Sequence, residues 1–288
     1  MKNSIHQEKA QKWFKQLRDD IVFTMESIEK DYASKMGGTA GQYDITPWSR
    51  MDISGQPGGG ETAIMRDGLV FEKAGVNIST VWGEFSEEFR DKIPGASDND
   101  GGFWASGISL VMHPRNPFVP PVHMNTRHII TSKSWFGGGA DLNPIYKNDD
   151  DTKTFHDALK TCCDQHDPEY YTQYSKWADE YFWNAHRNEP RGVGGVFYDY
   201  LNNNDDAEWD KNFSFTKDVG KTFNEIYPQI VRVHMFDTYD KEHEDFMLFR
   251  RGRYAEFNLI HDRGTVFGLK TGGNVDAILM SLPPRVTW

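Results

Sequence analysis

The sequence is poor in cysteine and in long apolar runs. Its two cysteines, Cys162 and Cys163, are adjacent, so we expect neither a strain-free disulfide between them nor a CxxC zinc or redox motif. Such sparse use of cysteine is typical of a reducing, intracellular compartment. No apolar run reaches the ~18 residues of a membrane-spanning helix, and the N-terminal residues lack the apolar core of a secretory signal. These absences predict a soluble cytoplasmic protein without an integral membrane segment.

Positive charge is also in short supply. The 288 residues include 32 Lys and Arg against 43 Asp and Glu, a formal net charge of −11. Proteins that bind nucleic acid usually present a basic surface, so this balance argues against nucleic acid as a partner. An anionic small substrate remains compatible with the charge, because a cleft can be locally basic within an acidic protein.

Three common ligand-binding motifs are absent as well. The chain has no HExxH zinc motif, no GK[ST] of a P-loop and no GxGxxG of a dinucleotide fold. The glycine-rich string FGGGADLNP, residues 136–144, is therefore not expected to cradle a phosphate.

The hydrophobic pattern predicts hairpin-linked strands with helices clustered between them. Helices are predicted over residues 6–36, 152–166, 167–189, 215–235 and 238–251. Strands are predicted over residues 62–65, 69–74, 78–85, 104–113, 123–131 and 191–201, with a hairpin over 254–270, a last strand over 275–284 and a connector over 134–144. This segregation predicts an α+β fold: a large, mainly antiparallel β-sheet flanked by α-helices on both faces, built as a single domain over residues 1–288.

Polar side chains gather around the string HPRNPFVPPVHMNTRH, residues 113–128. On a strand, residues two apart share a face, so His123, Asn125 and Arg127 should point together. If the prolines fold the chain back so that two strands pair, Ser109 and His113 join the same face. That face would offer an imidazole for proton transfer, an amide, and a planar fork for a carboxylate. A solvated sheet face without function is the alternative.

The histidines suggest metal binding as another possibility. His113, His123, His156 and His186 would have to converge on iron, copper or zinc. Their spacing matches no compact ligand motif, and a single histidine on a helix is usually a hydrogen-bonded packing residue. We therefore expect no metal and keep these four as weak candidates.

Asp141 follows directly on three glycines, Gly137 to Gly139. Glycines let the backbone approach a bulky ligand closely, and the carboxylate would stand at that approach. An aspartate that hydrogen-bonds its own turn is the alternative.

Several long strings together are similar to one known family. The strings are HPRNPFVPPVHMNTR, WFGGGADLNP, KWADEYFWNAHRNEPRGVGGVFYD, RRGRYAEFNLIHDRGTVFGL and ILMSLPP, and they resemble, in order, the signatures of the oxygen-dependent coproporphyrinogen III oxidases. The resemblance covers nearly the whole chain. It implies an enzyme of haem biosynthesis that converts two propionates of coproporphyrinogen III into vinyl groups. The implied products are protoporphyrinogen IX, CO2 and hydrogen peroxide. O2 is the co-substrate, no cofactor is required, and the enzyme is a homodimer.

The resemblance also implies roles for particular residues. His123 matches the family's proton donor, Arg127 a contact to a propionate, and Asp141 an aspartate that engages pyrrole N–H groups. These three are the expected catalytic residues. Expected substrate-binding residues are Ser109, Asn125, Thr126, Arg127, Gly272, Gly273 and Asn274. His113, His123, His156 and His186 match histidines once suggested as metal ligands in bacterial relatives.

Two positions depart from the family pattern. Ala178 follows Trp177 where a cysteine is usual, and Asn274 stands where the family commonly has an arginine. An asparagine cannot form a bidentate ion pair with a carboxylate. Either Arg263 or Arg250 takes over that role, or one propionate is held more weakly.

Three other functions remain open on the sequence alone. One is a metal-dependent oxygenase built on the four histidines. Another is a non-catalytic tetrapyrrole-binding protein, which would suit the 14% aromatic content equally well. The third is a structural dimer protein, which would leave the polar face of residues 123–127 without a role.

Overall fold

The computed structural model describes residues 2–55, 57–270 and 273–288. Its helices are α1 (Lys2–Met36), α2 (Arg50–Ser54), α3 (Glu87–Arg90), α4 (Asp149–Asp164), α5 (Tyr170–Tyr181), α6 (Asp206–His234), α7 (Lys241–Ile260), α8 (Arg263–Lys270) and α9 (Val275–Ile278), with 3-10 turns at Ser97–Asn99 and Leu279–Ser281. Its strands are β1 (Asp44–Ser49), β2 (Gly58–Arg66), β3 (Phe71–Glu84), β4 (Gly102–Pro114), β5 (Val122–Ile130), β6 (Ser134–Leu142), β7 (Trp183–Asn184), β8 (Glu189–Pro190) and β9 (Gly195–Asn202).

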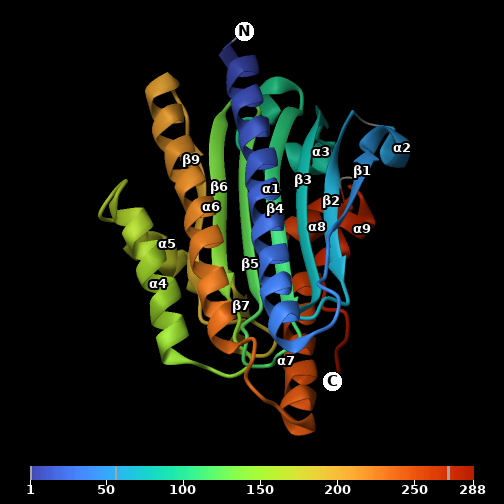
Figure 1. Ribbon diagram of the computed structural model, residues 1–288. Helices are drawn as coiled ribbons and strands as arrows, with labels where there is room; N and C mark the ends of the chain where they lie inside the picture. Colours follow the sequence, from blue (N-terminus) through green and yellow to red (C-terminus); the bar gives the residue numbers. More distant parts are fainter. Residues whose placement is uncertain (1, 56, 271–272) are drawn as a thin grey trace.

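The main sheet runs in the order β1-β2-β3-β4-β5-β6-β9, and every neighbouring pair in it is antiparallel. Helices α1 and α6 lie across one face, with α4 beside α6, and helices α7, α8 and α9 lie behind the sheet (Figure 1). This arrangement confirms the predicted α+β class with helices on both faces. Among the described residues, no helix is long and apolar enough to cross a membrane.

The α1 face of the sheet holds most of the hydrophobic core. The apolar side chains Leu17, Ile21 and Met25, spaced four residues apart on α1, are buried. They pack with strand residues such as Val76 and Leu110 in one cluster. The polar side chains of the candidate site lie on the opposite face, behind which α7, α8 and α9 are placed (Figure 1).

The sequence predicted a connector over residues 134–144, but the structure has strand β6 there. Glycines have no side chain that could reveal a two-residue period, so the strand is hidden in the sequence pattern. A Cβ added to Gly139 would lie 2.4 Å from the carbonyl oxygen of Val196. Glycine is therefore required where β6 and β9 approach each other.

The predicted hairpin over residues 254–270 is also wrong, because α7 continues to Ile260 and α8 follows at once. Asp262 directly precedes α8, and its carboxylate accepts hydrogen bonds from the backbone N–H and the hydroxyl of Thr265 in the first turn of that helix. Asp262, in the middle of the predicted hairpin, thus marks the start of a helix. Residues 275–284, predicted as a strand, hold α9 and a 3-10 turn.

The two middle helices also have other limits than predicted. Helix α5 ends at Tyr181, and the next residues form the small hairpin β7–β8. Helix α6 begins at Asp206, earlier than its apolar pattern suggested, and runs through Pro228. The hairpin matters for the site, because it delivers the residue that follows it, Arg191.

Candidate active site

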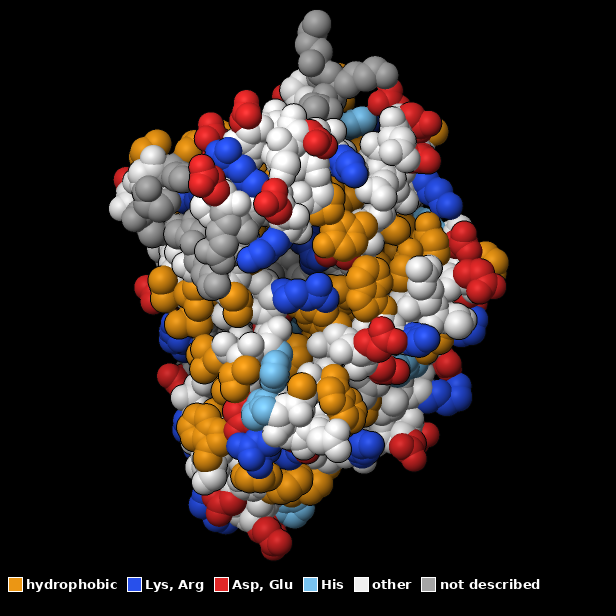
Figure 2. Space-filling model, turned by 180° about the vertical axis from the view of Figure 1, so that it is seen from behind, with side chains coloured by type: hydrophobic (Ala, Val, Ile, Leu, Met, Phe, Trp, Pro, Cys, Tyr) orange, Lys and Arg blue, Asp and Glu red, His pale blue; other side chains and the backbone are white. Residues whose placement is uncertain are grey.

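The predicted polar face on β5 is present. His123, Asn125 and Arg127 lie on the side of the sheet away from α1 and are partly exposed, whereas the residues between them are buried. Strand register places Ser109 of β4 opposite Asn125 and Asp141 of β6 opposite His123. Figure 2 shows this side of the molecule, where Lys and Arg side chains and hydrophobic rings surround a hollow.

The floor around these side chains is flat because glycines flank it. Gly107 of β4 and Gly137 of β6 lie on either side of Arg127 in the register, and Gly139 lies beside Asn125. Ser109, with its small side chain, is exposed although it lies in the middle of a central strand. A surface of backbone and small side chains suits a broad, planar ligand.

Asp141 forms a saturated, buried ion pair. Both Nη2 contacts from Arg191 to its carboxylate oxygens measure 2.8 Å, His123 Nδ1 lies 2.8 Å from Oδ1, and the Asn143 amide donates to Oδ2 at 2.9 Å. Burial alone would raise the pKa of Asp141, but the Arg191 guanidinium and the His123 hydrogen bond outweigh it and lower that pKa. The carboxylate is only 1% exposed, and its expected contact with pyrrole N–H groups stays a prediction.

Arg191 is held in an aromatic box. Its guanidinium carbon lies 4.3 Å, 4.8 Å and 4.6 Å from the ring centres of Phe182, Tyr254 and Phe257, and its Nη1 donates to the Asn258 side-chain oxygen at 3.1 Å. Flat rings on a guanidinium are a favourable, low-dielectric setting for a paired charge. The guanidinium is therefore fixed beneath the site.

On the open side, Arg127 ties the β5 side chains together. Its Nη1 donates to Asn125 Oδ1 at 2.9 Å, and the Asn125 amide nitrogen lies 3.1 Å from His123 Nε2. Its Nη2 donates to the Asp199 carboxylate at 2.7 Å. The four residues form one hydrogen-bonded row from the edge strand β9 toward Asp141.

A β-bulge in β9 aims Asp199 at this row. The register between β6 and β9 shifts between Phe136 and Gly138, and Tyr200 adopts a left-handed φ of 57°. A Cβ on Gly137 would lie 2.4 Å from the Asp199 carboxylate and 3.0 Å from the Arg127 guanidinium. The bulge and the glycine together make room for the ion pair.

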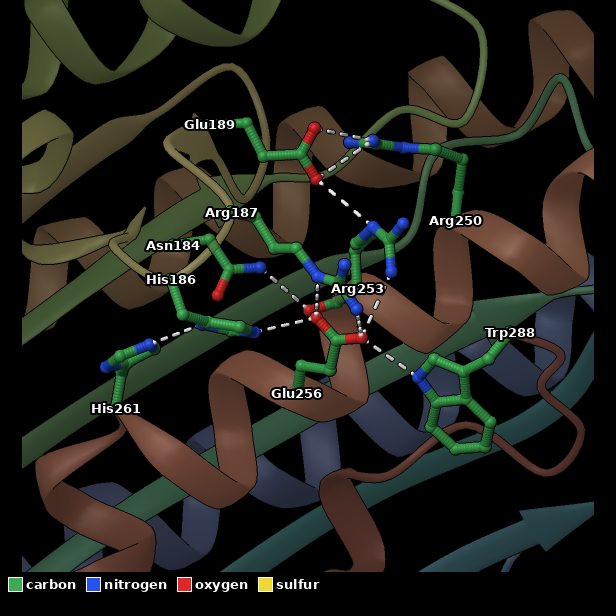
Figure 3. Close-up of polar contacts among 9 residues, drawn as sticks. All are labelled: Asn184, His186, Arg187, Glu189, Arg250, Arg253, Glu256, His261 and Trp288. Atoms are coloured by element: carbon green, nitrogen blue, oxygen red, sulfur yellow. Dashed lines mark hydrogen bonds and ion pairs between the residues drawn. The ribbon is translucent and has the colours of Figure 1, made fainter.

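The rim of the site carries Asp262, Tyr181 and Arg263. The Tyr181 hydroxyl donates to Asp262 at 2.9 Å, and the Arg263 guanidinium lies 4.9 Å from the Tyr181 ring centre. Burial would raise the pKa of Asp262, but hydrogen bonds from Thr265 and the positive charge of nearby Arg191 hold that pKa below its usual value. Arg263 is exposed and is the better placed of the two predicted substitutes for the missing arginine. Arg250 pairs instead with Glu189 (Figure 3).

Other expected substrate-binding residues are placed differently. Thr126 points to the α1 face and is fully buried, so its side chain cannot reach the cleft. Gly272 lies outside the described residues. The backbone N–H of Gly273 donates to the Gly268 carbonyl at 3.0 Å. The side-chain oxygen of Asn274 accepts from the backbone N–H of Ala277 at 3.2 Å and so caps α9.

The four histidines weighed as metal ligands do not converge. His113 contacts the Ser281 carbonyl and is fully buried, and burial together with nearby Arg251 lowers its pKa to about 3. His156 contacts Tyr171 and Val193. His186 lies between His261 and Glu256 in the network of Figure 3. In the part of the chain that the structure describes, no group of three or more His, Cys, Asp or Glu side chains is arranged for a metal ion.

Sequence reasoning missed Arg191, Asp199 and Asp262. Arg191 and Asp199 lie in the string RGVGGVFYD and Asp262 in HDRG, and a charged residue just before or within a buried strand is a signal that could have found the first two. No spacing in the sequence pairs Arg191 with Asp141.

Comparison of the sequence with known proteins identifies its family. The family model described as Coproporphyrinogen III oxidase matches residues 9–288. The chain belongs to the coproporphyrinogen III oxidase family. It is 52% identical over 286 residues to the oxygen-dependent coproporphyrinogen-III oxidase of Rickettsia bellii (strain RML369-C), with 99% of each chain covered. The relatives of the same name from Rickettsia rickettsii (strain Sheila Smith) and Rickettsia akari (strain Hartford) are each 51% identical, over 99% and 98% of both chains.

Within the coproporphyrinogen III oxidase family, the flat floor and the β5 row are the parts of this chain that offer chemistry to a ligand. The row supplies a cation that can bind a carboxylate and an imidazole that can move a proton. Both lie on one accessible face.

Proposed function

We propose that this protein catalyses the oxygen-dependent oxidative decarboxylation of two propionates of coproporphyrinogen III to vinyl groups. Each step converts R–CH2–CH2–COO⁻, O2 and H⁺ into R–CH=CH2, CO2 and H2O2. Two steps give protoporphyrinogen IX. The chain's membership of a family of oxidoreductases supports this reaction. The single structural observation that carries it is Arg127, a partly exposed guanidinium in one hydrogen-bonded row with Asn125 and His123 on a glycine-flanked floor.

Arg127 and Asn125 are proposed to hold the reacting propionate. A guanidinium binds a carboxylate with two parallel hydrogen bonds, and a fixed position for the reacting group lowers the barrier through orientation. Ser109 and Gly139 would lie beneath the macrocycle. Arg263 at the rim is placed to bind a further propionate in place of the arginine that Asn274 replaces.

No cofactor is proposed, with O2 as the only co-substrate. The reduced macrocycle is electron-rich and can itself deliver two electrons to O2. The separate hydrogen-bond partners of His113, His156 and His186 support a metal-independent reaction. A metal-dependent oxygenase would need these histidines to move together.

A cytoplasmic homodimer that works as one domain completes the proposal. Both cysteines are unbridged and buried, which suits a reducing compartment. Exposed apolar side chains on α7 and at the C-terminus, Phe246, Phe249 and Trp288, offer a surface for a second copy. Light scattering should give twice the 33.2 kDa chain mass, and a monomer at micromolar concentration would count against the dimer.

The decisive experiment is turnover of coproporphyrinogen III in air and under argon, each with and without a chelator. We expect vinyl product and CO2 in air, none under argon, and no loss with chelator. Binding without product in air would favour the tetrapyrrole-binding alternative. Loss of activity with chelator, restored by one metal, would favour the metal-dependent oxygenase.

A further inference from the structure

We propose that Arg191 and Arg127, acting through Asp141 and Asn125, hold His123 as the neutral tautomer with its proton on Nδ1. Nε2 is then a proton acceptor that faces the active site. Arg191 is a positioning residue here, because it touches Asp141 and not the substrate. The chemical use of this tautomer rests on the proposed function, whereas the tautomer itself is a property of the chain.

One end of the row fixes the proton on Nδ1. A guanidinium only donates hydrogen bonds, so both Asp141 oxygens act as acceptors for Arg191, each at 2.8 Å. The pair is almost completely buried, with exposed fractions of 2% and 1%, and an ionised carboxylate is the form that it stabilises. A carboxylate has no proton to give. The 2.8 Å contact between His123 Nδ1 and Asp141 Oδ1 therefore requires the proton on Nδ1.

The other end fixes the lone pair on Nε2. Arg127 donates to Asn125 Oδ1 at 2.9 Å, which settles the orientation of the Asn125 amide. Its NH2 group consequently faces His123 Nε2 at 3.1 Å. An amide nitrogen donates and does not accept, so Nε2 must be the acceptor. Two permanently charged guanidinium groups thus set the same tautomer from opposite ends.

The environment gives this arrangement little freedom to rearrange. Phe182, Tyr254 and Phe257 surround the Arg191 guanidinium, and Asn143 fills the remaining side of Asp141. Turning the carboxylate away from His123 would leave a buried charge with fewer partners. The tautomer is accordingly built into the fold before any ligand arrives.

The proposed reaction has a use for such an acceptor. A propionate that becomes a vinyl group loses CO2, one proton and two electrons. The electrons go to O2, and His123 Nε2 accepts the proton. The reduced O2 then takes up this proton and one further proton from the medium to form H2O2. His123 is thereby assigned as a base in the first step, whereas the family resemblance had implied a proton donor.

The test is ¹⁵N NMR of protein labelled at histidine, in which the two tautomers have distinct nitrogen shifts. His123→Gln identifies the signal. We expect the Nδ1–H pattern in the wild type at neutral pH and its loss in Arg191→Gln. Arg251→Gln is the matched control, because that guanidinium is equally buried and donates to Glu72 at 2.6 Å but has no link to His123.

Asp141→Asn is the second variant, in case Arg191→Gln does not fold. The single oxygen of the new amide will be taken by Arg191, so its NH2 group turns to His123 and favours the Nε2–H tautomer. Turnover should fall by on the order of 10³-fold or more, as when an amide replaces the carboxylate that orients a catalytic imidazole.

The outcomes separate the two proposals. An Nε2–H or doubly protonated His123 in the wild type, or an unchanged Nδ1–H pattern in both variants, overturns the inference whatever the activity. An Nδ1–H pattern that is lost in both variants and kept in Arg251→Gln supports it. If that pattern is found but the wild type does not turn over coproporphyrinogen III, the proposed function fails and the tautomer assignment stands.

Discussion

Two arginine–aspartate pairs frame the site, and they differ in their exposure to water. Arg191 and Asp141 meet at 2.8 Å with exposed fractions of 2% and 1%, whereas Arg127 and Asp199 meet at 2.7 Å with 28% and 17%. The bond lengths are nearly the same. Only the surroundings differ, aromatic rings in one case and the open floor of the sheet in the other.

The difference in exposure suggests that the two pairs have different functions. A buried pair is expensive to desolvate and tolerates no loss of a partner, so its geometry is fixed. A partly exposed pair contributes little to stability, because water competes for both charges. Arg127 can therefore exchange Asp199 for a ligand carboxylate at small cost, while Arg191 cannot leave Asp141. The Arg127–Asp199 pair is therefore suited to binding a ligand, and the Arg191–Asp141 pair to positioning its neighbours.

The largest effect should come from removing the buried cation. Arg191→Met leaves Asp141 buried without its partner and should lower the free energy of unfolding by about 3–5 kcal/mol. Arg127→Met should lower it by less than about 1 kcal/mol. Urea denaturation of both variants measures the difference. Equal losses would show that burial does not distinguish the two pairs.

For Arg127, a small effect on stability should be accompanied by a large effect on activity. Arg127→Met keeps the fold but removes the cation proposed to hold the propionate, so kcat/KM should fall about 30-fold or more, given the 2–5 kcal/mol typical of a truncated charged contact. Arg127→Lys should recover only part of this, because an ammonium lacks the planar fork. Near wild-type kcat/KM in Arg127→Met would refute the role proposed for this residue.

The sequence was informative where side chains alternate. The strands around residues 104–113 and 123–131 were predicted because polar and apolar residues change every second position, and this period also put His123, Asn125 and Arg127 on one face. Strand β6 was missed because its glycines carry no such signal. Residues 254–270 were misassigned because a short mixture of apolar and polar residues fits a strand as well as a helix.

The buried pair could not be predicted for a different reason. Arg191 and Asp141 are 50 residues apart, and only the packing of the β7–β8 hairpin against α7 brings them together. In that packing Glu256 of α7 accepts from His186, Arg187, Arg253 and the C-terminal Trp288 (Figure 3). Such contacts between distant segments leave no periodic trace in the sequence.

Lowering the pH should weaken the buried pair. The pKa of Asp141 is held below its ordinary value of 3.8, so at acid pH the unfolded chain binds a proton more readily than the folded one. The stabilisation is complete above about pH 4 and is lost as the pH falls through the folded pKa. Between pH 7 and pH 3, the wild type should lose about 1 kcal/mol more than the double variant Asp141→Asn/Arg191→Met. Parallel pH profiles from urea denaturation would contradict this reasoning.

A smaller effect is expected at the exposed carboxylate. Asp199→Asn frees Arg127 from its resident counter-ion, and KM for the tetracarboxylate substrate should fall by up to about fivefold, the size of an exposed ion pair. Asp210→Asn is the matched control, because it removes the same charge from α6 on the far face, where Asp210 pairs only loosely with Lys9 at 3.9 Å. A KM that rises in Asp199→Asn alone would show that orientation of Arg127 outweighs competition.

The smallest effect should follow from restoring the arginine that the family commonly carries. Asn274→Arg adds a cation near the rim, where Arg263 already supplies one, so KM should stay the same or fall by less than about threefold, well under 1 kcal/mol. The variant also loses the side-chain cap of α9, which Asn274→Ser would keep without adding charge. Comparing the two separates the cap from the cation. A severe loss of kcat/KM in Asn274→Arg alone would mean that the substrate lies across this end of the sheet in a different arrangement, and that the open pair at Arg127 is not its principal anchor.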